Sequence, residues 1–493
     1  MSRLVSALEV NSRLRGVIET QAAQMETLNG RLETAQRQTA VLVRRVEQLE
    51  RQIGKDSSNS GKPPSSDGPF TKKKPKDRSL RDKTGRRPGK QPGEPGSTMK
   101  LVDDPDESHR CPPVVCSCCA ADLGGALVTA ERRQQITEIT APVPPKVIEY
   151  LLQAKHCGRC GTISQGELPG HVRARASFGP EVHAQAANLV AAHHIPVHRA
   201  TLLLAQMAGV RVSSGWMASV RGKAVRLIQA SGFMDAVITL LRQSSAIHAD
   251  ETPARAAAGT AYVHLACTRY LTHLHVGGRS AADIDAGGVL PGYDGVLVRD
   301  GYTGYAHLTD AAHAWCAVHL LRDLKDLYEF EPKQQGWARD MAALLIQARD
   351  AASDARAQGS DALDNAVLAD LLDHYRRLAA AGIARNEYRH TVTAADARRI
   401  ARRFLDYQDM ILRFVTRPDL DIFSNNEAER TIRPVKVQMR SSGGCWRTLQ
   451  GLMEFAIVQS YLSTAAKWGI DKLDALRRLF TEKPWIPPAV TPT

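Results

Sequence analysis

Short strands that end near acidic residues constrain the fold of this chain more than any other feature. Residues 246–252 form an apolar segment that delivers Asp250, and residues 296–299 form another that ends on Asp300. The residues between them are rich in β-branched and aromatic side chains, which favour strands. Pro253 follows the first segment closely, so Asp250 is expected at an exposed edge of a sheet. The stretch predicts a sheet that presents two carboxylates where its strands end.

A third carboxylate comes from much later in the chain. The run Asn425-Asn426-Glu427-Ala428-Glu429 opens a segment of helical character, and Arg430 and Arg433 follow it with guanidinium groups suited to phosphate. Three carboxylates from two strand ends and one helix can hold Mg²⁺, which prefers oxygen ligands. Cleavage of a phosphodiester by two metal ions needs such groups to hold the ions about 4 Å apart. Taken singly, each acidic residue is more often a cap or a surface charge, and Glu427 competes with Glu429.

Length and charge set the broad class of the chain. Its 493 residues are too many for one ordinary domain, and 43% are hydrophobic, which suffices for an aliphatic core. The net charge of +13 favours a polyanionic partner, with nucleic acid ahead of a membrane surface. No run of about 18 apolar residues and no signal-peptide pattern occurs, so we expect no membrane span and a cytoplasmic location.

An unbroken heptad pattern runs through residues 4–53. A stripe of apolar residues that repeats every 3.5 residues supercoils two or more helices, so residues 1–53 are predicted to form a coiled coil and to self-associate. Polar Asn11 and Gln21 on the same stripe are able to fix the register of such a coil. The alternative is a long helix that packs on its own domain. The heptad is longer than a typical globular helix, which favours self-association.

A basic, low-complexity segment follows at residues 54–108. Serine, proline, glycine and lysine dominate it, and it offers almost nothing apolar to bury, so we expect a disordered linker. Residues 54–100 hold 13 Lys and Arg against 5 Asp and Glu, which is most of the excess charge of the chain. The segment is therefore either a solvated tether or a basic arm that follows DNA phosphates, and one segment can serve as both.

Clustered cysteines mark residues 109–170 as a separate module. Two Cys-x-x-Cys pairs supply four thiolates, the number that a structural tetrahedral Zn²⁺ needs, while leaving no open position for catalysis. The predicted ligands are Cys116, Cys119, Cys157 and Cys160. Cys111 and Cys118 are additional thiols, and His109 or His156 can replace a thiolate. The alternative is a set of reduced, buried thiols; the paired spacing favours zinc.

Residues 171–243 have an all-helical pattern. Within them, residues 195–207 and 214–227 flank a short turn that contains Gly209, an arrangement that resembles a helix-turn-helix DNA-binding motif. The second predicted helix carries Arg221, Lys223 and Arg226. Two interpretations fit equally: a DNA-reading motif, or a layer of helices packed beside the catalytic sheet. Short matches to this motif are common by chance.

The remaining residues divide into a catalytic unit and a tail. Residues 244–470 contain the strands and the third acidic residue, and a helical insertion at residues 325–421 separates Asp300 from Glu429. Residues 471–493 form a C-terminal tail whose proline-rich end cannot be helical. We therefore expect an α/β multidomain protein.

Several motifs together resemble one known family. Those in the catalytic unit are His248-Ala-Asp-Glu-Thr252, Asp300-Gly-Tyr-Thr-Gly-Tyr305, Cys316-Ala-Val-His-Leu-Leu-Arg322 and Asn425-Asn-Glu-Ala-Glu-Arg-Thr-Ile-Arg-Pro434. They look like the DDE transposases of the IS sixty-six insertion-sequence family. The linker motifs Gly54-Lys-Asp-Ser-Ser-Asn-Ser60, Lys62-Pro-Pro-Ser-Ser-Asp67 and Gly89-Lys-Gln-Pro-Gly-Glu-Pro-Gly96 are similar to that family as well, so the resemblance covers nearly the whole chain.

The resemblance implies a fold, a site and a substrate. It implies an RNase H-like catalytic core with a helical insertion, in which Asp250, Asp300 and Glu429 bind Mg²⁺ or Mn²⁺. It also implies terminal inverted repeats and a target DNA as substrates and a nucleoid-associated location, and it leaves open whether accessory proteins encoded by the element take part. The chain departs from the family at Ala317-Val318 and in residues 441–447, which bears on contacts to DNA ends or target and leaves the acidic triad intact.

Three functions are consistent with these features. The first is a transposase that cuts and joins DNA strands. The second is a zinc-containing DNA-binding regulator with a vestigial acidic core, which would leave a footprint on DNA without metal-dependent cleavage. The third is an RNase H-like nuclease that releases ends without joining them. The intact acidic triad favours an enzyme over a regulator.

Overall fold

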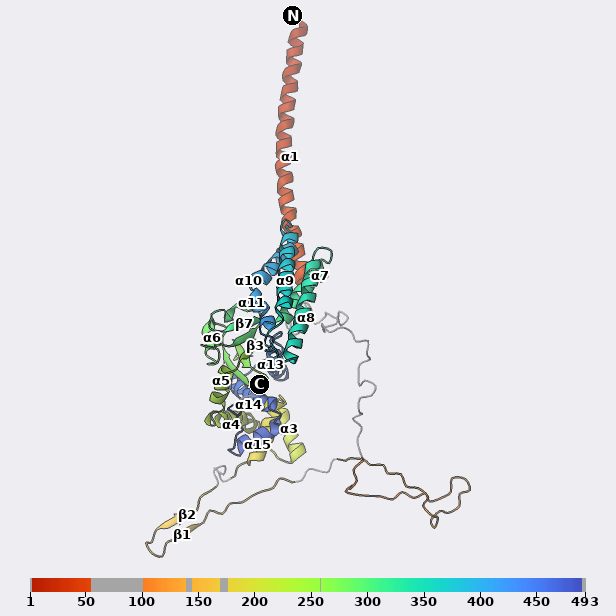
Figure 1. Ribbon diagram of the computed structural model, residues 1–493, viewed down its shortest axis with the longest axis vertical. Coiled ribbons are helices and arrows are strands. Elements are labelled where there is room, and N and C mark those ends of the chain that lie inside the picture. The colour runs from red at the N-terminus through yellow and green to blue at the C-terminus, as the bar shows by residue number, and fades with distance from the viewer. Residues whose placement is uncertain (1, 55–100, 139–143, 169–175, 258, 490–493) are drawn as a thin grey trace.

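The computed structural model describes residues 2–54, 101–138, 144–168, 176–257 and 259–489. Figure 1 shows a sheet and its surrounding helices as one body, from which the long helix α1 (Ser2–Gly54) projects. The structure is mixed α/β with a helical majority. The linker predicted at residues 54–108 lies mostly outside the described residues.

A mixed five-stranded sheet forms the centre of this body. Its strands are β3 (Ala246–Ala256), β4 (Gly259–Cys267), β5 (Thr272–Gly277), β6 (Val296–Arg299) and β7 (Ala312–Trp315), in the spatial order β5-β4-β3-β6-β7. β3, β4 and β5 pair antiparallel, whereas β3, β6 and β7 pair parallel. All four residues of β6 are buried, as expected for a strand with a neighbour on each side.

The strand that carries Asp250 differs from the sequence-based expectation. β3 is the central strand and continues past Pro253 to Ala256, so Asp250 does not lie on an edge strand. The parallel pairing with β6 ends at His248, while the antiparallel pairing with β4 continues. Pro253 is tolerated because it lies beyond the last β6 partner, where that side of β3 needs no backbone donor. Asp250 therefore lies just beyond the point at which β3 stops pairing with β6.

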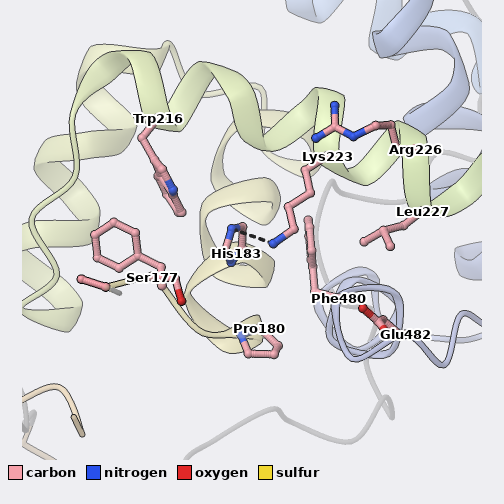
Figure 2. Close-up of a pocket in the computed structure, with 11 residues that line it drawn as sticks. Ser177, Pro180, His183, Trp216, Lys223, Arg226, Leu227, Phe480 and Glu482 are labelled. Carbon is pink, nitrogen blue, oxygen red and sulfur yellow. Dashed lines mark hydrogen bonds between the residues drawn. The ribbon is translucent and has the colours of Figure 1, made fainter. Parts of the chain in front are cut away.

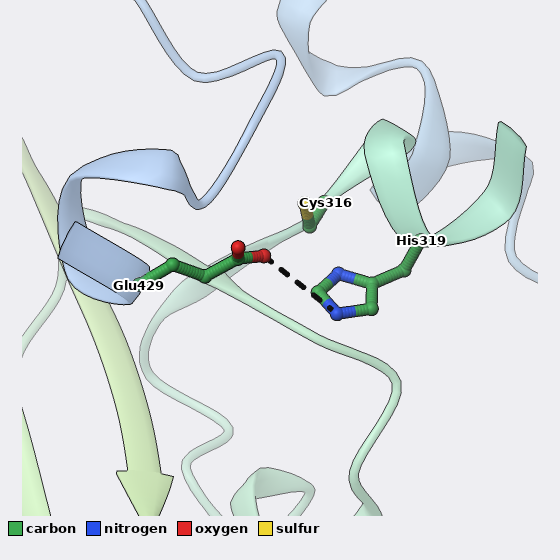
Figure 3. Close-up of side chains that lie close together, drawn as sticks. All are labelled: Cys316, His319 and Glu429. Carbon is green, nitrogen blue, oxygen red and sulfur yellow. Dashed lines mark ion pairs between the residues drawn. The ribbon is translucent and has the colours of Figure 1, made fainter. Parts of the chain in front are cut away.

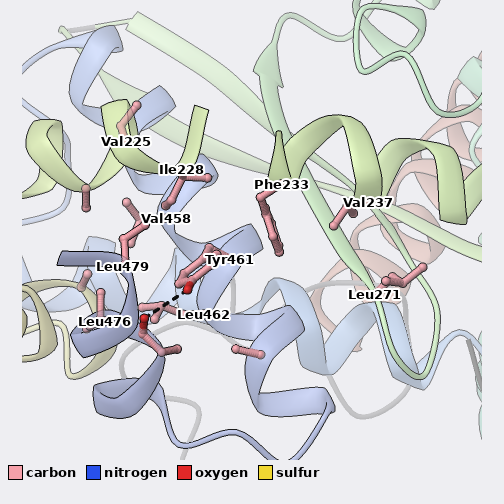
Figure 4. Close-up of a cluster of buried hydrophobic side chains, with 14 of the residues drawn as sticks. Val225, Ile228, Phe233, Val237, Leu271, Val458, Tyr461, Leu462, Leu476 and Leu479 are labelled. Atoms are coloured by element: carbon pink, nitrogen blue, oxygen red, sulfur yellow. Dashed lines mark hydrogen bonds between the residues drawn. The ribbon is translucent and has the colours of Figure 1, made fainter. Parts of the chain in front are cut away.

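Helices that precede the sheet in the sequence, together with helices near the C-terminus, cover one part of the sheet. They are α2 (Pro180–Ala187), η2 (Asn188–Ala192), α3 (Val197–Ala208), α4 (Ser214–Ala230), α5 (Phe233–Arg242), α14 (Leu449–Lys467) and α15 (Lys472–Phe480). Figure 4 shows their shared core, in which Phe233 meets the ring of Tyr461 edge-on and Tyr461 donates to the backbone oxygen of Ala475. Burying each such side chain contributes about 1.5–3 kcal/mol.

The outer strand β5 is covered by α14. The backbone N–H groups of Thr272 and Leu274 donate to the hydroxyl oxygens of Thr464 and Ser460, at 3.1 and 2.9 Å. An uncovered edge strand offers its N–H groups to any passing chain. Two hydroxyl side chains therefore satisfy this edge, which closes that end of the sheet.

A second group of helices lies between β7 and the third acidic residue. It comprises α7 (Ala317–Phe330), α8 (Gly336–Ala357), α9 (Asn365–Asn386), α10 (Val392–Asp406), α11 (Gln408–Ile411) and α12 (Arg413–Thr416). The helical pattern predicted for residues 325–421 is present. These helices share a core with β6 and β7, and the chain then returns to the sheet as α13 (Asn426–Ser441), which packs on β3 and β4. Shorter elements are β1 (Ala154–His156), β2 (Ile163–Gln165), α6 (Ala281–Asp285) and η3 (Thr303–Tyr305).

The predicted heptad segment forms one continuous helix, α1. Its apolar side chains are exposed along the described length, for example Leu28 at 61% and Leu42 at 65%. Toward its C-terminal end, α1 lies beside His390 and Thr391 at the start of α10. Among the described helices, no single one is long and apolar enough to cross a membrane; α4 and α5, bent by 60°, meet that criterion only as a pair.

Candidate active site

Asp250 lies in a concentration of negative charge. Burial raises its pKa to about 8, and the charges of Asp300, Glu251 and Glu429 add to the effect. One carboxylate oxygen, Oδ1, accepts a hydrogen bond from the backbone N–H of Glu251 at 2.9 Å. When carboxylates are held close together, their mutual repulsion favours protonation of the most buried one. Three predicted site residues, from β3, from the loop directly after β6 and from α13, are thus electrostatic neighbours.

A rigid loop holds Asp300 directly after β6. The backbone N–H of Tyr302 donates to Asp300 Oδ1 at 2.8 Å. The buried Arg299 guanidinium donates to the backbone oxygens of Asp300 and Tyr302, at 2.9 and 3.0 Å, and to His313 Nδ1 at 2.8 Å. Arg299 therefore fixes the backbone of Asp300 and of the loop that follows it.

Glu429 contacts a histidine and a cysteine that precede it by more than a hundred residues. Figure 3 shows its carboxylate directed at His319, with 3.8 Å between Glu429 Oε1 and His319 Nε2. Burial alone would lower the pKa of His319, but its hydrogen bond to Cys316 and the charges of Cys316 and Glu429 raise it to about 9. A protonated His319 would attract the Glu429 carboxylate and help to orient it.

The tightest group of metal-ligating atoms differs from the predicted cage. In the part of the chain that the structure describes, ligating atoms of Cys316, His319 and Glu429 all lie within 4.8 Å of one another, and neither aspartate belongs to this group. Glu429 Oε1 is buried without a hydrogen-bond partner. A cation between Glu429 and the aspartates would pair this oxygen and relieve the repulsion at Asp250, so the residues present fit a divalent metal ion.

Asn425 joins the three parts of the site. Its backbone N–H donates to Cys316 Sγ at 3.1 Å, and its side-chain Nδ2 donates to the backbone oxygen of Ala249 at 2.7 Å. Burial lowers the pKa of His248, so the neutral ring can donate from Nδ1 to Asn425 Oδ1, at 3.1 Å. Sequence analysis identified Asn425 only as part of a motif; its position directly before α13, two residues ahead of the first acidic residue, was the available signal.

The structure separates Glu427 from Glu429. Glu427 pairs with Lys467 at 3.0 Å and with Arg430 at 2.7 Å. These cations outweigh burial and lower the pKa of Glu427. Lys467 also donates to two backbone oxygens at the turn between β4 and β5. Glu427 therefore connects α13 to α14 and the sheet, and the Arg430 guanidinium proposed for phosphate contacts Glu427 here.

Glu251, next to Asp250, is a site residue that sequence analysis did not assign. Its carboxylate accepts from Arg279 and from the Tyr305 hydroxyl, both at 3.0 Å. Arg279 in turn lies over the ring of Tyr302, 4.0 Å from its centroid. The network links β3 to the loop after Asp300 and thereby sets the spacing of the two aspartates.

The predicted zinc ligands form two matching turns. Cys116 accepts from the Ala120 N–H and Cys157 accepts from the Gly161 N–H, each at 2.9 Å. Hydrogen bonds lower the pKa of Cys116, mainly from the Cys119 backbone, and that of Cys160, mainly from the Thr162 hydroxyl. In the described residues, however, no three cysteine sulfurs lie within 4.8 Å of one another. The two halves are formed but stand apart, and the four-thiolate zinc site stays a prediction.

The helices of the predicted helix-turn-helix are both present. Gly209 ends α3 with a φ of +67°, and the Ser213 hydroxyl caps α4 by accepting from the Trp216 N–H at 3.1 Å. α4 packs against α2, α3, α14 and α15. Arg221 faces Glu454 on α14, whereas Lys223 and Arg226 line a pocket. α4 is thus part of a helical layer, and a DNA-reading role for it stays a prediction.

Comparison with known proteins assigns the chain to a family. A model for a family of unknown function (DUF6444) matches residues 12–100, and no curated protein matches the chain. A model described as the transposase IS66 family matches residues 175–454, more than half of the chain. This match includes both aspartates, Glu429 and the intervening helices. The chain belongs to the IS66 family of transposases and is a DNA-processing enzyme of that kind.

Proposed function

We propose that this protein is a DDE transposase that cuts and joins DNA by metal-assisted phosphoryl transfer. The observation that carries the proposal is that Asp250, Asp300 and Glu429 are close enough to interact electrostatically: burial raises the pKa of Asp250 to about 8, and the charges of Asp300 and Glu429 add to that shift. Carboxylates gathered in one partly buried site repel one another unless a metal ion balances their charge. Mg²⁺ or Mn²⁺, when bound, would polarise the attacking and leaving oxygens of a phosphodiester.

The topology supports an RNase H-like core. Three antiparallel strands followed by two parallel ones, with one acidic residue on the central strand and another after its parallel neighbour, fit that fold. The helices between β7 and α13 would then be the insertion that separates Asp300 from Glu429. Fold alone does not give function, so the proposal rests on the acidic residues near the point where β3 and β6 separate.

Each residue of the site has a distinct task in this proposal. Asp250 and Asp300 bind metal from the sheet, and Asp250 gives up its proton to do so. Glu429 binds from α13, with His319 setting its direction. Asn425 keeps α13, β3 and the start of α7 in register. The substrates would be the element's terminal inverted repeats and a target DNA, approached in the cytoplasm at the nucleoid, with accessory proteins where the element encodes them.

The test is strand cleavage and joining on DNA that carries the element's ends, with Mg²⁺ or Mn²⁺ and with EDTA. Cleaved ends that become joined to a second DNA support a transposase. Release of ends without joining would make the protein a nuclease, and a footprint without cleavage would make it a regulator. The variants that assign the residues are treated in the Discussion.

His319 is expected to act by positioning Glu429. Replacing it with alanine should lower the rate of cleavage about 10- to 100-fold, as is usual for residues that orient a metal ligand. The measurement is cleavage rate against Mg²⁺ concentration. A positioning role predicts that more Mg²⁺ recovers part of the activity, whereas a loss that no metal concentration changes would contradict it. His374→Ala, on α9, is the matched control.

The exposed stripe of α1 supports a homo-oligomer formed through a coiled coil. Leu42 lies on the heptad and Val41 beside it does not, yet both are 65% exposed in the single chain. Leu42→Lys should therefore weaken self-association more than Val41→Lys, because only Leu42 would be buried between helices. Sedimentation velocity of the full-length protein measures this. Equal effects of the two variants, or a monomeric parent protein, would reject the coiled coil.

The two cysteine turns support a structural zinc ion. We expect about one Zn per chain in protein purified without chelators. Cys116→Ser or Cys157→Ser should lower the zinc content, whereas Cys118→Ser should leave it unchanged, because Cys118 is outside both pairs. Elemental analysis gives the ratio. Zinc-free parent protein, or an equal loss in Cys118→Ser, would contradict the assignment.

A further inference from the structure

A second site lies away from the acidic residues, between α2, α4 and α15. It is a pocket of about 680 Å³, within the range of about 300–1,000 Å³ usual for ligand sites. Figure 2 shows that α4 contributes Trp216, Lys223 and Arg226, while α2 contributes His183 and α15 contributes Phe480. None of these residues takes part in the acidic site.

Aromatic rings form one continuous wall of this pocket. Phe178 meets Trp216 edge-on at 4.7 Å between ring centroids, and Trp216 lies 5.0 Å from His183. His183 lies 5.4 Å from Phe480, with 33° between the ring planes. A row of rings that line a cavity offers π-faces to a planar ligand, and such stacking does not depend on which base is presented.

Two cations lie on the α4 side of the same pocket. Lys223 and Arg226 are three residues apart on one face of the helix. Lys223 Nζ donates to His183 Nε2 at 3.1 Å, and His183 Nδ1 donates to the backbone oxygen of Gly179 at 3.0 Å. Burial and the nearby lysine lower the pKa of His183, so the ring stays neutral and serves as the acceptor that aims the ammonium. The wall consists of aromatic rings inclined to one another, and its α4 rim is positive.

We propose that this pocket binds one unpaired nucleotide of the DNA substrate. The base stacks on Trp216, with the largely buried Phe480 at the far end of the aromatic wall, and its phosphate lies against Lys223 and Arg226. Glu482, after α15, also lines the pocket, so the phosphate belongs on the α4 side, away from that carboxylate. Stacking rings beside cations are the features by which proteins hold single-stranded nucleic acid. The inference depends on the proposed function in one respect: it takes DNA as the substrate.

The experiment uses the full-length protein and a single-stranded oligonucleotide with 5-iododeoxyuridine at successive positions. Irradiation joins the iodinated base to an aromatic ring on which it stacks, and peptide mass mapping finds the residue. We expect crosslinks at Trp216, Phe178 or Phe480. In binding assays without irradiation, Trp216→Ala should weaken affinity for the oligonucleotide about 5- to 30-fold, and Trp216→Phe should restore most of it. Lys223→Ala and Arg226→Ala should each reduce the slope of log affinity against log salt by about one.

Control variants keep the result interpretable. Tyr388→Ala removes a highly exposed aromatic residue from the turn between α9 and α10, and Arg377→Ala removes an exposed cation from α9; neither should alter crosslinking or affinity. Thermal unfolding verifies that Trp216→Ala is folded, and Trp216→Phe covers the case in which it is not. Crosslinks confined to other residues, or unchanged affinity in Trp216→Ala and Lys223→Ala, would overturn the proposal that this pocket binds a nucleotide. Metal-dependent cleavage is measured separately: cleavage without pocket crosslinks rejects only this inference, and crosslinks without cleavage reject only the proposed function.

Discussion

Replacing Asp250, Asp300 or Glu429 with alanine is expected to lower the rate of metal-dependent strand cleavage by at least about 10³-fold. Each residue supplies an oxygen ligand from a different element, so the loss of any one opens the metal site. A lost ligand removes several kcal/mol of transition-state stabilisation, and every 1.36 kcal/mol is a factor of ten in rate. The measurement is the initial rate of cleavage on element-end DNA at saturating Mg²⁺.

The controls separate this effect from general damage. Asp310→Ala removes an exposed carboxylate close in sequence to Asp300 and should retain the parent rate. Glu427→Gln tests the neighbouring acid: it weakens the contact with Lys467 and should lower thermal stability more than it lowers cleavage. DNA affinity measured without metal should be unchanged in the three alanine variants. Normal cleavage in any one of them would remove that residue from the metal site.

The competition between Glu427 and Glu429 shows where sequence reasoning stops. Both residues lie in the first turn of α13, and both are followed by basic residues. Residues two positions apart on a helix point about 200° away from each other, so only one of Glu427 and Glu429 can face the aspartates of the sheet. Lys467 decides which, by pairing with Glu427 from α14, forty residues later in the chain. No local pattern contains that contact.

The strands were predictable and their relation to the acidic residues was only partly so. β-branched and aromatic residues located β3 to β6, because a buried sheet selects them. The sequence did not reveal that β3 continues past Pro253, because this depends on where β6 ends beside it. It also did not reveal the clamp by Asn425, whose three partners come from β3 and from the residue before α7. Contacts between distant segments follow from packing, which no spacing within one segment encodes.

Basic residues on α4 give a similar lesson. Arg221, Lys223 and Arg226 share one helix, and sequence alone did not distinguish their roles. In the structure Arg221 faces Glu454 on α14, while the other two line the aromatic pocket. The division follows from the direction each residue takes around the helix and from which neighbour covers that side. A cluster of charge in the sequence is therefore at best a list of candidates.

Replacing Asp250 with asparagine is expected to stabilise the metal-free protein. Burial and the charges of Asp300, Glu251 and Glu429 raise the folded-state pKa of Asp250 to about 8, whereas an unfolded aspartate titrates near 3.9. Between these two pH values the folded protein binds the proton more tightly than the unfolded chain does. The contribution to stability is therefore fully present below about pH 4 and is lost as pH rises through 8. Asparagine has no charge to lose.

The stability gain should accordingly grow with pH. Because Asp250 is partly accessible to solvent, we expect about 1–3 kcal/mol at pH 8.5, or roughly 2–4 °C in melting temperature per kcal/mol, and little difference at pH 4. Thermal melts of Asp250→Asn and the parent protein in EDTA across this range measure it, with Asp310→Asn as the control. Adding Mg²⁺ should make the parent protein more stable than Asp250→Asn, because bound metal stabilises only the protein that retains the Asp250 carboxylate. A variant that is less stable than the parent in EDTA at pH 8.5 would mean that Asp250 is held by partners of its own. Asp250 would then be a structural residue whose charge its own neighbours already balance. No unbalanced charge would be left for the proposed metal ion.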